Sequence, residues 1–148
     1  MHALSVVLTI AAATFAAAVG GVYIAFSALV LPALRDNSDA ITVMRRVNVV
    51  AVRAPFMFVF FGSALTAAAV LVVELVTGAH PLVVVGAVLA LASFAVTVVR
   101  NVPLNNELAG PTGDWQRFEP RWRRANHLRA ALAIGAAVAL ITSLADFG

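Results

Sequence analysis

Three polar side chains stand at the start of the last apolar stretch of this chain. Asn126, His127 and Arg129 follow the basic segment "RWRR" and lead directly into "AALAIGAAVALITSLA". A run of arginines is enough to anchor a helix end at a membrane surface, so the amide and the imidazole need a further reason. Amide and guanidinium groups stabilise an oxyanion in a site of low dielectric. Imidazole exchanges protons near neutral pH. Together they would suit proton abstraction with stabilisation of the anion that results.

Helical spacing sets which way these side chains face. Residues three and four apart share a face, and one such face carries Trp122, Asn126, Arg129 and Ala133. At about 1.5 Å of rise per residue, Arg129 lies roughly 7 to 8 Å deeper than Arg124. A charged arginine in hydrocarbon costs about 2.5 to 3.5 kcal/mol on insertion scales, so this depth needs an explanation.

Two interpretations of Arg129 and Asn126 remain open. In the first, the guanidinium snorkels to the headgroups and the amide bonds to backbone groups. In the second, both point inward and form a polar pocket with amides from other segments, and we favour this one. His127 lies roughly 100° from Asn126 around the helix, so it faces either the pocket or the headgroups.

An amphipathic segment supplies one of the other amides. The residues "DNSD" at 36–39 offer N-caps for a helix. From Ile41 to Pro55 the pattern is helical and places Asn48 in the apolar stripe, with Arg46 and Arg53 on another face. Pro55 has no N–H to donate, so we expect a kink where this helix enters the membrane.

A second group of amides follows the third apolar stretch, in "RNVPLNNELAGP". Pro103 disfavours helix at Val102 and is predicted to break the helix there. Asn101, Asn105 and Asn106 are then expected at the same mouth of the bundle as Asn48.

Four long apolar stretches predict four membrane-spanning helices. Crossing a hydrocarbon core of about 30 Å takes about 20 apolar residues, and 62% of the 148 residues are hydrophobic. Backbone groups in lipid must bond within their own segment, so these stretches are helices. We predict an all-α integral membrane four-helix bundle with helical extensions on the cytoplasmic side, in a single domain of residues 1–148. The predicted spans are residues 4–31, 54–76, 81–100 and 125–145, with Pro120 opening the last helix in its first turn.

The arginines predict the orientation of the bundle. Loops rich in arginine stay in the cytoplasm, whereas the turn "TGAHP" and both chain ends hold no arginine. We therefore expect both termini outside and both long loops inside. The loop arginines are Arg35, Arg45, Arg46 and Arg53 in the first, and Arg117, Arg121, Arg123 and Arg124 in the second.

Small residues recur at four-residue spacing in two spans. Such rows let helix backbones approach closely in lipid, which predicts a compact bundle and leaves a homo-oligomer as an alternative. The rows are Ala12, Ala16 and Gly20 in the first span, and Ala131, Gly135 and Ala139 in the last.

Composition argues against several functions. The formal net charge is only +3, so we expect no nucleic-acid partner. The absence of cysteine excludes disulfides and thiolate metal sites. His2 and His80 leave a two-histidine metal or haem site as a weaker alternative, because no third ligand is evident. Glu74 is expected to be a solvated residue near the outer surface.

Four stretches of the chain resemble the anthrone oxygenase-like family, in order and in approximate spacing. They are "GGVYIAFSALVLPAL", "MRRVNVVAVRAPFMFVFFGSAL", "RNVPLNNELA" and "RWRRANHLRAALA". The resemblance extends from Gly20 to Ala133, and it is most specific at Pro103–Asn105 and at Trp122–Arg129.

The resemblance implies a small four-helix membrane protein. It also implies an oxygenase that uses molecular oxygen without metal, flavin or other cofactor, as some members do when they oxidise an anthrone to an anthraquinone. Its likeness to bacterial members implies the inner membrane. We expect membrane lipid and a hydrophobic aromatic small molecule as partners. The expected catalytic residues are His127, Arg129, Asn126 and Asn105, and the expected substrate-binding residues are Asn48, Asn101, Trp122 and Trp115. The alternative is a non-enzymatic bundle that binds a lipid, a quinone or a partner subunit through the same mouth.

Overall fold

The computed structural model describes residues 2–78 and 80–147, which are helical except for short connections. Four segments are long and apolar enough to cross a membrane, namely Ala3–Leu34, Phe56–Thr77, Pro81–Ala109 and Trp115–Ser143. This confirms the predicted all-α four-helix fold with helical extensions. The second span agrees with its predicted bounds to within a few residues, whereas the other segments extend further, mainly toward the long loops.

The chain forms these elements in order. The first segment consists of α1 (His2–Ala25), the π-helical η1 (Phe26–Val30) and α2 (Leu31–Leu34). It is followed by α3 (Ala40–Ala51) and α4 (Phe56–Thr77). The third long segment consists of α5 (Pro81–Val96), the π-helical η2 (Thr97–Asn101) and α6 (Val102–Ala109). The chain closes with α7 (Trp115–Ser143) and the 3₁₀ turn η3 (Leu144–Phe147).

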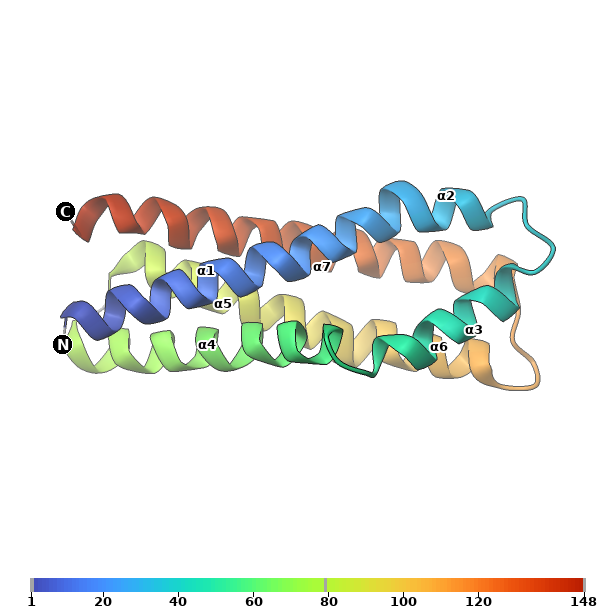
Figure 1. Cartoon of the computed structure of the whole chain (residues 1–148), viewed down its shortest axis with the longest axis horizontal. Helices are drawn as coiled ribbons and strands as arrows, with labels where there is room; N and C mark the ends of the chain where they lie inside the picture. Colours follow the sequence, from blue (N-terminus) through green and yellow to red (C-terminus); the bar gives the residue numbers. More distant parts are fainter. Residues whose placement is uncertain (1, 79, 148) are drawn as a thin grey trace.

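The long helices pack in a ring, with α1 between α4 and α7, and α5 closing the ring between the same two helices. Both chain termini lie at one end of the elongated bundle, and α2, α3 and α6 lie at the other (Figure 1). We call these the terminal end and the loop end. The loop end also carries the arginine-rich segments, as the sequence predicted for one side of the membrane.

Two apolar cores fill the bundle at different levels. The first joins the four long helices with small side chains such as Ala12, Ala16, Ala87 and Ala136. The second lies at the loop end, where Met44 of α3 packs with residues of α2, α6 and α7. This second core consists of Leu31, Leu34, Ala40, Met44, Leu104, Leu108, Phe118 and Trp122.

One of the two predicted rows of small residues is a helix contact. Ala12, Ala16 and Gly20 are buried, and a Cβ at Gly20 would lie 2.8 Å from the Ile134 side chain of α7. The row in the last span does not face the bundle in this way, because Ala131 is exposed and Gly135 and Ala139 are only half-buried. On α7 the buried small residues are Ala130, Ala133, Ala136 and Ala137.

Both π-helical turns end two residues before a proline. The N–H of Leu31 bonds to the carbonyl of Phe26 before Pro32, and the N–H of Val102 bonds to the carbonyl of Thr97 before Pro103. Proline lacks an N–H and crowds the carbonyl four residues back, and widening the preceding turn relieves both problems. The prediction that Pro103 breaks the helix is therefore wrong, because the helix continues to Ala109.

The prediction that Pro120 opens the last helix is also wrong. Helix α7 begins five residues earlier, at Trp115, and contains Pro120 in its interior. Asp114 makes the earlier start possible, because its carboxylate accepts hydrogen bonds from the N–H groups of Gln116 and Arg117.

The kink expected near Pro55 is instead a full break, and the helix predicted to continue to Pro55 ends earlier. Helix α3 ends at Ala51, and α4 begins at Phe56 after a short turn. Met44 is buried, Ile41 packs on the loop-end core, and Arg46 and Arg53 are exposed. The amphipathic pattern therefore identified the inner face of α3 correctly.

Glu74 is buried, so the prediction of a solvated residue is wrong. Only 3% of the residue is exposed, although it lies near the terminal end of α4. Its carboxylate accepts hydrogen bonds from the Ser5 hydroxyl of α1 and from the His80 N–H at the start of α5. Glu74 thus joins three helices at the terminal end.

We predict that the hydrogen bonds of Glu74, rather than its charge, hold this end together. Glu74→Leu leaves two donors unsatisfied and should lower the free energy of unfolding by about 1 to 3 kcal/mol. Glu74→Gln should be nearly neutral, because its amide oxygen can accept from His80 and its NH₂ can donate to Ser5. Denaturation in mixed micelles, followed by circular dichroism, measures both variants. Equal losses in the two variants would show that the charge is what matters.

Candidate functional site

Arg129 lies inside the bundle, with only 6% of the residue exposed. Its Nε donates to Asn126 Oδ1 at 3.0 Å, and its Nη1 donates to Thr97 Oγ1 at 3.3 Å. The guanidinium carbon lies 3.9 Å from the centre of the Tyr23 ring and 5.1 Å from that of the Trp122 ring. These contacts hold the guanidinium plane against two aromatic faces, an arrangement that favours a cation.

Asn126 ties α7 to α1. It is fully buried, and its Nδ2 donates to the Tyr23 carbonyl at 2.8 Å and to Ser27 Oγ at 2.7 Å. Its Oδ1 receives the bond from Arg129. Every polar atom of the amide is therefore used, and the amide orients the arginine.

A row of hydroxyl groups completes the cluster from the side of α5 and η2. Ser93 donates to the Arg129 carbonyl at 2.8 Å, and Thr97 donates to the Ser93 carbonyl at 3.2 Å. Tyr23 and Thr97 hydroxyl oxygens are 3.2 Å apart. Since Thr97 has a single hydroxyl hydrogen, Tyr23 is the donor in that pair. We call Tyr23, Ser93, Thr97, Asn126 and Arg129 the arginine cluster.

The asparagines of the third segment lie one and two turns further toward the loop end. Asn101 is 1% exposed, and its Nδ2 makes a long 3.5 Å bond to the Trp122 carbonyl. Asn105 is half-buried, and its Oδ1 accepts from Trp122 Nε1 at 2.8 Å. Trp122 therefore connects both amides to the arginine cluster, because its ring also faces Arg129.

Two buried amide atoms have no hydrogen-bond partner within residues 2–78 and 80–147. They are Asn101 Oδ1 and Asn48 Nδ2. Asn48 lies on α3, one turn from the buried Met44, on the face that packs at the loop end. A buried acceptor and a buried donor without partners are costly unless a ligand or water satisfies them.

The structure does not bring His127 to this cluster. His127 is exposed on the outer face of α7, while Asn126 and Arg129 on either side are buried. Trp115 is half-buried at the start of α7 and packs on the Phe118 ring at 5.7 Å between centroids. It lies at the far loop end, almost four turns of helix from the arginine.

Sequence reasoning missed the side chains that contact Arg129 from other helices. Tyr23 lies in the apolar run of the first segment, and its contact with the arginine was not anticipated. Ser93, Thr97 and Asn101 form a polar row at four-residue spacing in an otherwise apolar helix. That row is the signal that could have identified this face of the third segment.

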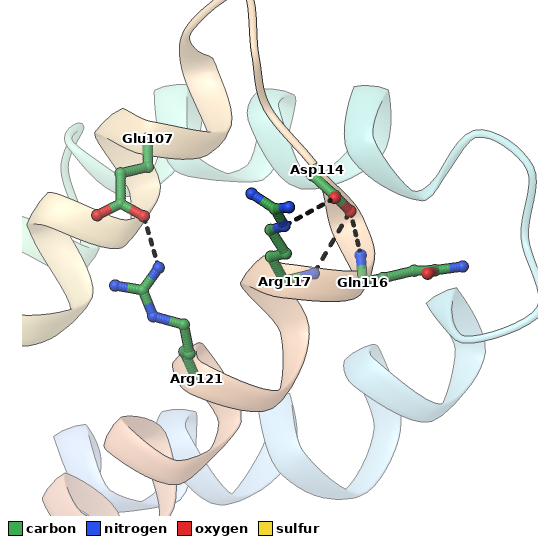
Figure 2. A network of polar contacts seen from close by, with 5 residues as sticks. All are labelled: Glu107, Asp114, Gln116, Arg117 and Arg121. Atoms are coloured by element: carbon green, nitrogen blue, oxygen red, sulfur yellow. Dashed lines mark hydrogen bonds and ion pairs between the residues drawn. The ribbon is translucent and has the colours of Figure 1, made fainter.

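A separate hollow of about 230 Å³ lies at the tip of the loop end. Its charged side chains are largely engaged with one another (Figure 2), with Arg121 and Glu107 2.8 Å apart and Asp114 3.6 Å from Arg117. These pairs are solvent-exposed and contribute little to stability. No residue of the arginine cluster lines this hollow, so it is separate from the site built around Arg129.

The described residues contain no group of three or more His, Cys, Asp or Glu that could hold a metal ion. The side chain of His2 lies outside the described residues, so the two-histidine alternative is not tested.

Comparison with known proteins gives one match. The sequence model of a family described as anthrone oxygenase matches residues 55–139. The matched region includes α4 through most of α7, and with them Asn101, Asn105, Asn126 and Arg129. No curated protein and no solved structure matches the chain. Because the match extends over more than half of the chain, this protein belongs to the anthrone oxygenase family.

Proposed function

We propose that this protein is a membrane-embedded oxygenase that needs no cofactor and oxidises an activated aromatic carbon acid, such as an anthrone, with molecular oxygen. The observation that carries the proposal is the buried arginine cluster. It holds a guanidinium between aromatic rings at the loop-end side of an apolar bundle. Family membership supports the reaction class.

The chemistry requires little from the protein beyond anion stabilisation. Removing a proton from the CH₂ of an anthrone gives a carbanion whose charge spreads onto the carbonyl oxygen. This anion gives one electron to O₂, and the carbon radical and superoxide combine into a peroxide anion at the same carbon, which takes up a proton to become the hydroperoxide. Loss of water from the hydroperoxide gives the second carbonyl of the anthraquinone. One O₂ is consumed and one H₂O is released for each substrate.

Arg129 is the residue best suited to stabilise the oxyanion. Its Nε and Nη1 each donate once within the protein, and a guanidinium carries five N–H donors in all. A preorganised cationic donor in an apolar site stabilises a developing oxyanion strongly. The proton passes to water at the loop end, because His127 faces away from the cluster.

The unpartnered amides would fix the orientation of the substrate. Asn101 Oδ1 accepts from a hydroxyl substituent, and Asn48 Nδ2 donates to an oxygen. Trp122 offers an aromatic surface beside Arg129. A flat apolar molecule that carries oxygen substituents matches this set of groups.

We expect the purified protein, free of metal and flavin, to consume oxygen when anthrone is added. The rate of oxygen uptake at an electrode and the rate of anthraquinone formation, followed by absorbance, should both exceed the autoxidation seen with empty micelles. Asn105→Ala should lower the rate about tenfold, the equivalent of one lost hydrogen bond. Asn106→Ala is the matched control, because Asn106 is exposed next to it. Equal rates in both variants would remove Asn105 from the site.

The alternative of a non-enzymatic bundle has a distinct outcome in the same experiment. A quinone or lipid that co-purifies with the wild type and is lost in Arg129→Ala, without oxygen uptake on any carbon acid, would overturn the oxygenase proposal.

A further inference from the structure

Helix α3 has an outward face that nothing else in the described chain covers. Its inner face packs at the loop end, chiefly against α6. Arg45 fixes this packing, because its Nε and Nη2 donate at 2.8 Å to the carbonyls of Leu108 and Gly110. The helix is therefore held in one orientation, and its other face points away from the bundle.

That outward face combines apolar and basic side chains. Val49 and Val50 are 56% and 57% exposed, and Val52, just beyond the helix, is 68% exposed. Arg46 lies one helical turn before Val49 and Val50, and Arg53 follows them. Both arginines are exposed. In residues 2–78 and 80–147, no carboxylate forms an ion pair with either arginine.

Charge is distributed unevenly along this segment. The acidic residues Asp36 and Asp39 precede the helix, whereas Arg46 and Arg53 lie in its second half and just after it. Figure 1 shows α3 running obliquely from the tip of the loop end back to the start of α4. Its basic and apolar half therefore lies nearest the level at which α4 enters the membrane.

We propose that the second half of α3, with the turn that follows it, is an interfacial anchor that inserts into the anionic headgroup layer of the adjacent leaflet. The valines enter the boundary between headgroups and acyl chains, and the two arginines bind lipid phosphates. Basic amphipathic helices bind anionic membrane surfaces in this manner. Charge complementarity selects anionic phospholipid as the occupant, because exposed valine alone would not distinguish it from neutral lipid.

The chain contains no cysteine, so a single cysteine can carry a nitroxide label without any background substitution. We would label Val50→Cys in nanodiscs that contain anionic phospholipid and compare its collisions with oxygen and with a water-soluble nickel complex. Leu65→Cys, in the middle of α4, is the lipid reference, and Gln116→Cys, at the exposed tip, is the water reference. The oxygen-to-nickel collision ratio of the Val50 label is expected to lie between those of the two references, well above that of the Gln116 label.

The role of the arginines is tested in the same labelled protein. Combining Arg46→Gln with Arg53→Gln should lower the ratio of inserted to water-exposed label about 30-fold, because each basic residue contributes separately at an anionic surface. Replacing the anionic nanodiscs with neutral ones should lower this ratio to a similar extent for the helix that keeps both arginines. Arg117→Gln, at the exposed tip, should leave the ratio of inserted to water-exposed label unchanged. Circular dichroism confirms that the variants remain folded.

Two results would overturn the anchor. One is a Val50 label that collides with the nickel complex as often as the Gln116 label does in anionic nanodiscs. The other is dipolar broadening of the Val50 label, which would show that a second copy of the chain, and not lipid, covers this face.

Discussion

Arg129→Lys is expected to lower the rate of anthrone oxidation by about 100- to 1,000-fold, the usual cost of losing one oxyanion donor. Lysine keeps the positive charge, but it cannot donate to Asn126 and Thr97 from a rigid plane while stacking on Tyr23. The ammonium would have to choose among these partners, so its position relative to the substrate oxygen would no longer be fixed. Oxygen uptake at saturating anthrone measures the loss.

The matched control is Arg124→Lys, which changes an exposed arginine on the same helix and should leave the rate unaltered. Trp122 fluorescence reports whether the variant cluster is still packed. A folded Arg129→Lys protein with wild-type turnover would contradict the oxyanion role, whatever the substrate.

Asn126→Leu should clearly destabilise the packing of α7 on α1. The change removes two hydrogen bonds between α7 and α1 and leaves Arg129 Nε without its acceptor. Hydrogen bonds between membrane helices contribute about 0.6 to 1.7 kcal/mol each, so we expect the free energy of unfolding to fall by about 1 to 3 kcal/mol. Denaturation in mixed micelles, followed by circular dichroism, is the measurement.

His127→Leu is the control for this change, because it places the same side chain at the next position on the exposed face. We expect it to alter neither stability nor turnover. Loss of turnover in His127→Leu, with stability retained, would restore the histidine as the base and contradict our assignment of the proton to water.

The sequence predicted the features that depend on one segment at a time. Apolar length located the four spans, and three- and four-residue spacing placed Trp122, Asn126, Arg129 and Ala133 on one face, where all four are buried. The same argument identified the inner face of α3. These predictions succeeded because helix geometry alone determines which side chains share a face.

Features that depend on contacts between segments were missed. Tyr23 and Thr97 contact Arg129 from two other helices, and no pattern within α7 reveals them. Glu74 was expected in water because of its depth along α4, but burial depends on Ser5 and on the turn that brings His80 back over it. Pro103 was interpreted as a helix end, because a local rule for proline does not anticipate the wider turn that accommodates it.

The two widened turns determine which changes in chain length the first and third segments can tolerate. Each adds about one residue to its helix, which rotates everything beyond it by roughly 100° relative to an unbroken helix. Leu31, Leu34, Leu104 and Leu108 reach the loop-end core in this shifted phase. The side chains that face the core therefore follow one helical register before each widened turn and a register shifted by about one residue after it. Deleting one residue within 26–30 or 97–101 would remove the widened turn and keep both halves in register, whereas straightening the turn at constant length would turn the loop-end leucines outward.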